Sequence, residues 1–145
     1  MGEHAAVDRQ AGTYNVYHLH SSDLGTTWGA PEELTQTTVG SLYAAIVRDD
    51  LNIHLAWGNG GAGGALQYRH SGNGGAGWMP GATLVSGSSP TSAFVAVAGD
   101  VVHLIWRDMR NGHGAIYYKR NATGNQSTRP KITGFLQATS RGTST

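Results

Sequence analysis

The sequence contains no cysteine, which excludes disulfide bonds, thiolate metal ligands and a cysteine nucleophile. Charged residues make up only 13% of the 145 residues, and the net charge is +1. Because no basic run is present, the sequence predicts neither nucleic acid nor an anionic membrane surface as a partner. No segment has the apolar core of a signal peptide or the length of a transmembrane span, so neither is predicted.

Apolar residues at helical spacing are also missing. The best helix candidate, 41–49, has neighbours that favour a strand instead. What the sequence does have is 22 glycines, four tryptophans and six tyrosines, with short β-branched and aromatic runs between turn residues. This composition predicts an all-β protein with many tight turns.

The sequence repeats at a period of about 50 residues, the range that is typical of repeat architectures. Residues 15–28 align with 65–78, and 115–128 follow at the same spacing. Separately, 52–59 (NIHLAWGN) align with 101–108 (VVHLIWRD). Two segments that repeat at nearly the same period indicate tandem units of four short strands each. The predicted organisation is a lead over 1–12, a partial unit over 13–40, a complete unit over 41–90, a third unit over 91–138 and a polar tail over 139–145.

Each unit places a similar octet between its third and fourth strands, SSDLGTTW at 21–28 and SGNGGAGW at 71–78. Glycine supplies a left-handed turn residue, and Asp23 can accept backbone N–H bonds within its own turn. Trp28 is expected to fold against the core between neighbouring sheets. A calcium loop is the alternative, but the octet has one carboxylate and its second copy has Asn73 there, so no metal site is predicted.

The pattern S-x-D-x-G-x-x-W resembles the Asp box of the BNR, or sialidase-type, repeat. Ser21, Asp23, Gly25 and Trp28 match it fully, and Ser71, Asn73, Gly75 and Trp78 match with Asn for Asp. A third copy at 121–128 is degenerate. The resemblance implies a β-propeller with blades of four antiparallel strands, of which this chain would hold about two and a half to three. It also implies an extracytoplasmic or secreted protein.

In such a blade the loop between the second and third strands lies at the opposite end from the box, where the resemblance places ligand sites. In the third unit this loop concentrates charged and polar side chains that could bind a carboxylate or an acidic sugar. The simpler interpretation is a surface pair of Arg107 with Asp108 beside an Asn-Gly turn. The candidate ligand-binding residues are Arg107, Asp108, Arg110, Asn111 and His113.

The histidines are not predicted to be catalytic or metal-binding. His54 and His103 occupy equivalent positions of the repeat, so they are expected to pack or to form hydrogen bonds within each unit. His18, His20 and His70 flank the octets without the spacing of a metal site. The sequence therefore predicts no metal and no cofactor.

A sialidase, by the same resemblance, needs an arginine triad, an aspartate acid/base and a tyrosine–glutamate nucleophile pair spread over about six blades. No paired carboxylates can be proposed here, so no catalytic residue is predicted, although a longer parent protein could be an exo-sialidase-type enzyme. Three hypotheses stay open: a fragment or relative of a sialidase-like propeller, a non-catalytic carbohydrate- or protein-binding module, and a purely structural repeat. Ring closure would require either self-association or the remainder of a propeller.

Overall fold

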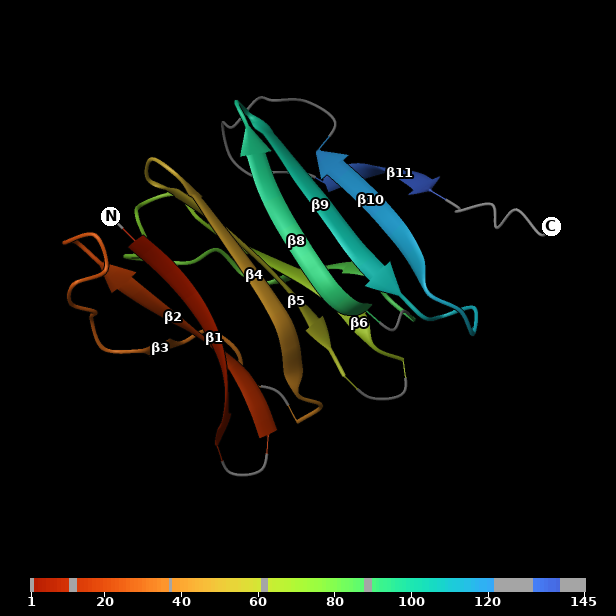
Figure 1. Ribbon diagram of the computed structural model, residues 1–145, viewed down its shortest axis with the longest axis horizontal. Coiled ribbons are helices and arrows are strands. Elements are labelled where there is room, and N and C mark those ends of the chain that lie inside the picture. Colours follow the sequence, from red (N-terminus) through yellow and green to blue (C-terminus); the bar gives the residue numbers. More distant parts are fainter. Residues whose placement is uncertain are drawn as a thin grey trace.

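The computed structural model of this protein describes residues 2–10, 13–36, 38–60, 63–87, 90–121 and 132–138. Within these ranges the regular structure consists of strands alone, so the all-β prediction is confirmed (Figure 1). The strands form three antiparallel sheets, and none of the sheets closes on itself. No helix in the described ranges is long and apolar enough to cross a membrane.

The first sheet has one strand more than the sequence predicted. β1 (Gly2–Gln10) pairs antiparallel with β2 (Thr13–Ser21), and β3 (Glu32–Glu33) pairs with the other side of β2. The prediction treated 1–12 as a lead segment, whereas the structure forms a strand over 2–10. This segment has Val7 as its single β-branched residue, so its strand propensity is low, and pairing with β2 decides its conformation.

The second and third sheets have the four-stranded organisation that the repeat predicted. The second sheet has the order β4 (Ser41–Asp49), β5 (Asn52–Asn59), β6 (Ala65–Ser71) and β7 (Ala82–Val85). The third sheet has the order β8 (Pro90–Ala98), β9 (Val101–Asp108), β10 (Ala115–Asn121) and β11 (Ile132–Ala138). The degenerate box from 122 onward and the tail over 139–145 lie outside the described residues.

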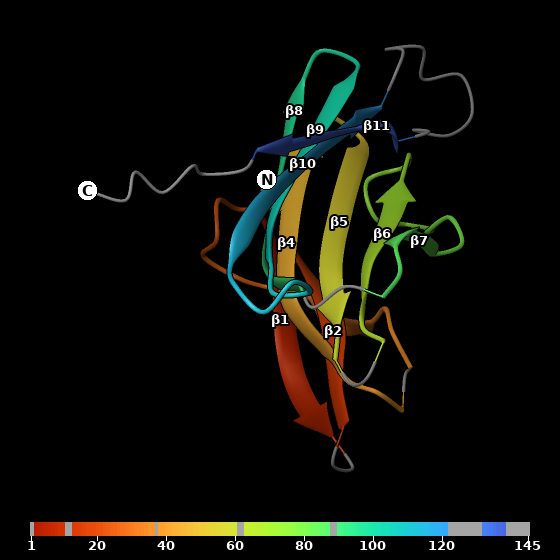
Figure 2. The ribbon, with the colours of Figure 1, turned by 90° about the vertical axis from the view of Figure 1, so that its right-hand side faces the viewer.

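The three sheets pack face to face in chain order, with the second sheet between the other two (Figures 1 and 2). One apolar core fills the space between the first and second sheets and includes Val16, Leu34, Leu55 and Trp57. The other lies between the second and third sheets and is built around residues such as Ala56, Leu66, Tyr68, Leu104 and Trp106. Two stacked cores, rather than one, hold the array together.

Each of the two interfaces contains an equivalent polar contact in addition to its apolar core. Arg69 of β6 donates from Nη1 to the carbonyl oxygen of Leu34 at 2.7 Å, and Lys119 of β10 donates to the carbonyl oxygen of Leu84 at 3.0 Å. Burial lowers the pKa of Lys119. In each case a cationic side chain on the third strand of one sheet donates to a backbone carbonyl near the last strand of the preceding sheet. The same polar contact therefore recurs at both interfaces between sheets.

Candidate functional site

The loop between β9 and β10, where the sequence placed candidate ligand residues, is held by a buried carboxylate. Asp108 is 1% exposed and accepts hydrogen bonds from the Arg110 backbone N–H at 2.9 Å and from Arg110 Nε at 3.0 Å. The Arg110 guanidinium also lies over the ring of Tyr117, 4.6 Å from its centroid. Asp108 and Arg110 are therefore brought together, but as an ion pair that shapes the loop.

The other three candidates are oriented differently. Asn111 Nδ2 donates to the Tyr117 hydroxyl oxygen at 3.5 Å, and His113 is exposed. Arg107 is exposed, and its Nη1 donates to Thr91 Oγ1 at 3.3 Å. Of the two loop arginines, Arg107 thus presents its charge to solvent while Arg110 is neutralised by Asp108.

The first octet folds into a turn closed by its own side chains. Ser21 Oγ donates to Asp23 Oδ1 at 2.8 Å and accepts from the Gly25 N–H at 2.8 Å. Gly25 has a φ of +86°, the left-handed conformation that glycine adopts at least cost. The Thr27 hydroxyl and backbone N–H both bond the Asp23 carboxylate, and with the Ser21 hydroxyl they lower the pKa of Asp23 to about 2. The carboxylate is thus used by the turn itself.

The second octet makes the same turn without a carboxylate. Ser71 Oγ donates to Asn73 Oδ1 at 2.9 Å and accepts from the Gly75 N–H at 3.0 Å, and Gly77 N donates to Asn73 Oδ1 at 2.9 Å. An amide oxygen can therefore replace the acid in this network. Turn closure explains both octets without a ligand.

The two octet tryptophans differ in their surroundings. Trp78 packs between the first and second sheets, edge-on to His18 with 5.3 Å between ring centroids. Trp28 is 44% exposed and lies beside Gly2 and His4, so the expectation that it is buried between sheets is wrong. The reason is that, within the described chain, no sheet packs on that side of the first sheet.

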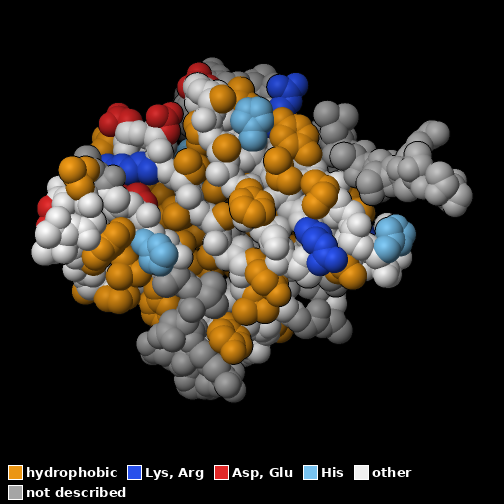
Figure 3. Space-filling model, in the orientation of Figure 1, with side chains coloured by type: hydrophobic (Ala, Val, Ile, Leu, Met, Phe, Trp, Pro, Cys, Tyr) orange, Lys and Arg blue, Asp and Glu red, His pale blue; other side chains and the backbone are white. Residues whose placement is uncertain are grey.

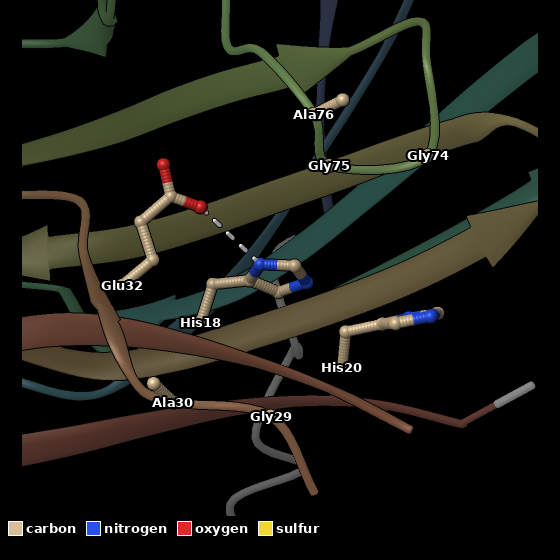
Figure 4. Close-up of a pocket in the computed structure, with 8 residues that line it drawn as sticks. All are labelled: His18, His20, Gly29, Ala30, Glu32, Gly74, Gly75 and Ala76. Atoms are coloured by element: carbon tan, nitrogen blue, oxygen red, sulfur yellow. Dashed lines mark ion pairs between the residues drawn. The ribbon is translucent and has the colours of Figure 1, made fainter. Parts of the chain in front are cut away.

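A cavity of about 320 Å³ lies between the first sheet and the second octet (Figure 4). In Figure 4 the Glu32 carboxylate points toward His18, and its Oε2 is 3.6 Å from His18 Nδ1. A Cβ on Gly75 would lie 2.8 Å from His18 Cε1, so only glycine allows the loop to come this close. The lining residues are His18, His20, Gly29, Ala30, Glu32, Gly74, Gly75 and Ala76.

Behind this cavity lies a buried carboxylate that the sequence did not reveal. The Glu3 side chain is 4% exposed, and it accepts from His18 Nε2 at 2.5 Å, from His20 Nδ1 at 2.9 Å and from Arg48. Burial would raise the pKa of Glu3, but the hydrogen bonds from His18, His20 and Arg48 outweigh it and hold the pKa below its ordinary value. Since Arg48 belongs to β4, the ionised Glu3 links the first sheet to the second.

One cross-strand pair recurs at the same register in all three sheets. The pairs are Glu3 with His18 (2.5 Å), His54 with Tyr68 (2.6 Å) and His103 with Tyr118 (2.8 Å). The contacts agree with the prediction that His54 and His103 are hydrogen-bonded within their units. Glu3 therefore replaces, in the first sheet, the histidine of the other two.

Because His54 is buried, we expect the free energy of unfolding to decrease in acid. Burial, reinforced by the nearby His70, lowers the pKa of His54 to about 4. The unfolded chain binds the proton at about pH 6.5 and the folded chain only near 4, so stability falls as the pH drops through this window, by about 3 kcal/mol in total. Urea denaturation between pH 7 and pH 4 measures this loss. In His54→Gln and His54→Phe the curve should be flatter, and curves parallel to the wild type would contradict the assignment.

No group of three or more His, Cys, Asp or Glu side chains in the described part of the chain is placed to hold a metal ion. Comparison of the sequence with protein-family models gave no match, and comparison with curated proteins gave none.

Proposed function

We propose that this chain is a segment or relative of a sialidase-like BNR-repeat propeller that has no complete glycosidase site and binds an acidic sugar without turning it over. The proposal rests on Arg107, which is exposed. It lies at the end of the third sheet opposite Asn121, where the degenerate octet begins. The octet turns, repeated on sheets of like topology, support the propeller part of the proposal.

Arg107 is positioned before any ligand arrives. Its Nη1 is bonded to Thr91, and a Cβ on Gly114 would lie 2.7 Å from its Nε, so the guanidinium lies against the loop backbone. The pair of Asp108 and Arg110 fixes the same loop from beneath. A guanidinium fork held in place binds a carboxylate through two parallel N–H bonds at a lower entropy cost than a mobile one.

The same loop argues against glycosidic cleavage. Asp108 is its acidic residue, and it is buried and engaged by Arg110. Glu32 and Glu33 are exposed on β3, the outer strand of the first sheet. By the resemblance, a sialidase-type site needs an aspartate acid/base beside a tyrosine–glutamate nucleophile pair, and these three carboxylates are not placed to supply it.

Binding is tested by titrating a methyl sialoside and its neutral parent sugar into the purified chain, with NMR or calorimetry as the readout. The acidic sugar should bind and the neutral one should not. Arg107→Ala should weaken binding at least tenfold, the loss of a charge-assisted pair. Arg120→Ala, at the opposite end of β10, is the matched control and should bind as the wild type does.

Any one of three results would overturn the proposal. Release of fluorophore from a fluorogenic sialoside by the purified chain would show a complete glycosidase site. Equal affinity in the wild type and Arg107→Ala, or no binding of any acidic glycan on an array, would remove the sugar-binding role.

A further inference from the structure

The outer face of the third sheet is apolar at its centre and carries a basic side chain on either side. It presents the even-numbered residues 92–98 of β8, the odd-numbered residues of β9 and the even-numbered residues of β10, because the even-numbered residues of β9 are buried on the inner face. Phe94 pairs with Ile105, and they are 68% and 44% exposed. Arg107 and Arg120, both exposed, lie on either side of this pair. Figure 3 shows hydrophobic side chains gathered over these strands with basic side chains beside them.

A further sheet cannot pack on this face in the way that the third sheet packs on the second. At that interface β8 lies against β4 and β5. A Cβ on Gly58 of β5 would be 3.0 Å from Pro90 Cγ and 3.1 Å from the Pro90 carbonyl oxygen, so the close approach depends on glycine. Arg107 occupies the equivalent position on β9. Its side chain fills the space that the first strand of another sheet would need.

The neighbouring row of side chains shows the same change from small to large. On the second sheet Ala45 pairs with Ala56, and Ala56 is fully buried in the core shared with the third sheet. On the third sheet Phe94 and Ile105 form the equivalent pair. Because these larger side chains would hold another sheet away, the outer face of the third sheet is open to a ligand instead.

We propose that this face binds an acidic oligosaccharide, whose first carboxylate pairs with Arg107 and whose following rings lie over Phe94 and Ile105 toward Arg120. The inference rests on the proposed function and extends it from a single sugar to a chain of them. Charge complementarity favours this ligand, because no Asp or Glu stands at the outward-facing positions of β8, β9 and β10 to repel an anion. The C–H faces of the sugar rings would cover the exposed Phe94 ring, which removes apolar surface from water.

The spacing of the two arginines separates a chain of sugars from a single one. Arg107 pairs with Ile116, and Arg120 lies four residues further along β10. At about 3.3 Å per residue along a strand and about 4.8 Å between strands, the two Cα atoms are roughly 14 Å apart. The Arg107 guanidinium is held beside Thr91 and Gly114, on the side away from Arg120. A single acidic sugar on Arg107 therefore leaves Arg120 unused, whereas a chain of such sugars reaches it.

The test is calorimetric titration of the purified chain with the methyl sialoside and with a trimer of the same acidic sugar. The trimer should bind the wild type roughly tenfold more tightly than the single sugar. Arg120→Ala should weaken trimer binding about threefold and Phe94→Ala about fivefold, and neither should change the affinity for the methyl sialoside. Leu51→Ala, half-exposed on the turn between β4 and β5, is the control and should bind both ligands as the wild type does. Thermal melts confirm that each variant is folded.

The outcomes separate this inference from the proposed function. A trimer that binds no more tightly than the methyl sialoside, or whose advantage survives both Arg120→Ala and Phe94→Ala, would overturn the extended surface and leave the single-sugar site in place. If neither ligand binds the wild type, the proposed function fails as well. Light scattering tests a protein partner: the wild type should have the mass of one chain, and a dimer that Phe94→Glu dissociates would assign the face to protein contact instead.

Discussion

Replacing Trp106 by alanine is expected to lower the free energy of unfolding by about 3–5 kcal/mol, the usual cost of emptying a buried aromatic site. Trp106 is fully buried between the second and third sheets and stacks on Tyr117 with 5.6 Å between ring centroids. Its Nε1 donates to Asp108 Oδ2 at 3.3 Å, so the core is tied to the end of β9, where Arg107 also lies. Urea denaturation monitored by circular dichroism measures the loss.

Trp28→Ala is the matched control, since the same residue type is half-exposed there. Trp28→Ala should cost less than half as much as Trp106→Ala. Trp106→Phe should recover part of the loss because it retains apolar volume. Equal losses at Trp106 and Trp28 would contradict the assignment of the core.

The repeat predicted the second and third sheets because their strands carry a strong local signal. NIHLAWGN and VVHLIWRD are β-branched and aromatic runs bounded by turn residues, and both became strands. Their burial could not be predicted. On β9, Val102, Leu104 and Trp106 are buried and the alternate residues are not, whereas β5 is buried on both faces because it lies between two sheets. The difference comes from the sheets that pack on each side of the strand. Two strands of similar sequence do not reveal these sheets.

The first sheet illustrates the limit of alignment by sequence. A shift of about 50 residues places His4 opposite His54. In the structure, Glu3 of β1 pairs with His20 of β2, just as His54 of β5 pairs with His70 of β6. Glu3, and not His4, is therefore the residue equivalent to His54. An alignment shifted by one residue assigns each side chain to the opposite face of the strand. The sequence therefore does not predict that the Glu3 side chain is buried.

The candidate loop was located from its sequence, but the roles within it were not. Neighbouring residues in a short loop are necessarily close, which is why Arg107, Asp108 and Arg110 could be singled out together. The burial of Asp108 depends on Trp106 and on the sheet beneath it. Asp108 on the buried face of β9 pairs with Arg110, whereas Arg107, its neighbour on the strand, points to the opposite face and is exposed.

Replacing Glu3 by glutamine is expected to lower the free energy of unfolding by about 3 kcal/mol at pH 7, because breaking a buried ion pair leaves its partner uncompensated. Arg48 loses its anionic partner at the junction of the first and second sheets, and His18 and His20 lose a strong acceptor. Glutamine has nearly the same volume, so little of the effect comes from packing. Thermal and urea denaturation of both proteins measures it.

The pH dependence separates charge from packing. The pKa of Glu3 is lowered by folding, so its stabilisation is fully present above the unfolded value of about 4.3 and is lost as the pH falls toward the lower folded value. The difference in the free energy of unfolding between the wild type and Glu3→Gln should therefore become smaller below about pH 4.3. Glu33→Gln is the control: Glu33 is exposed, and an amide oxygen can still accept from Asn15 Nδ2, so stability should change by less than about 0.5 kcal/mol. A gap for Glu3→Gln that stays constant from pH 7 to pH 3 would show that the carboxylate charge does not hold the two sheets together.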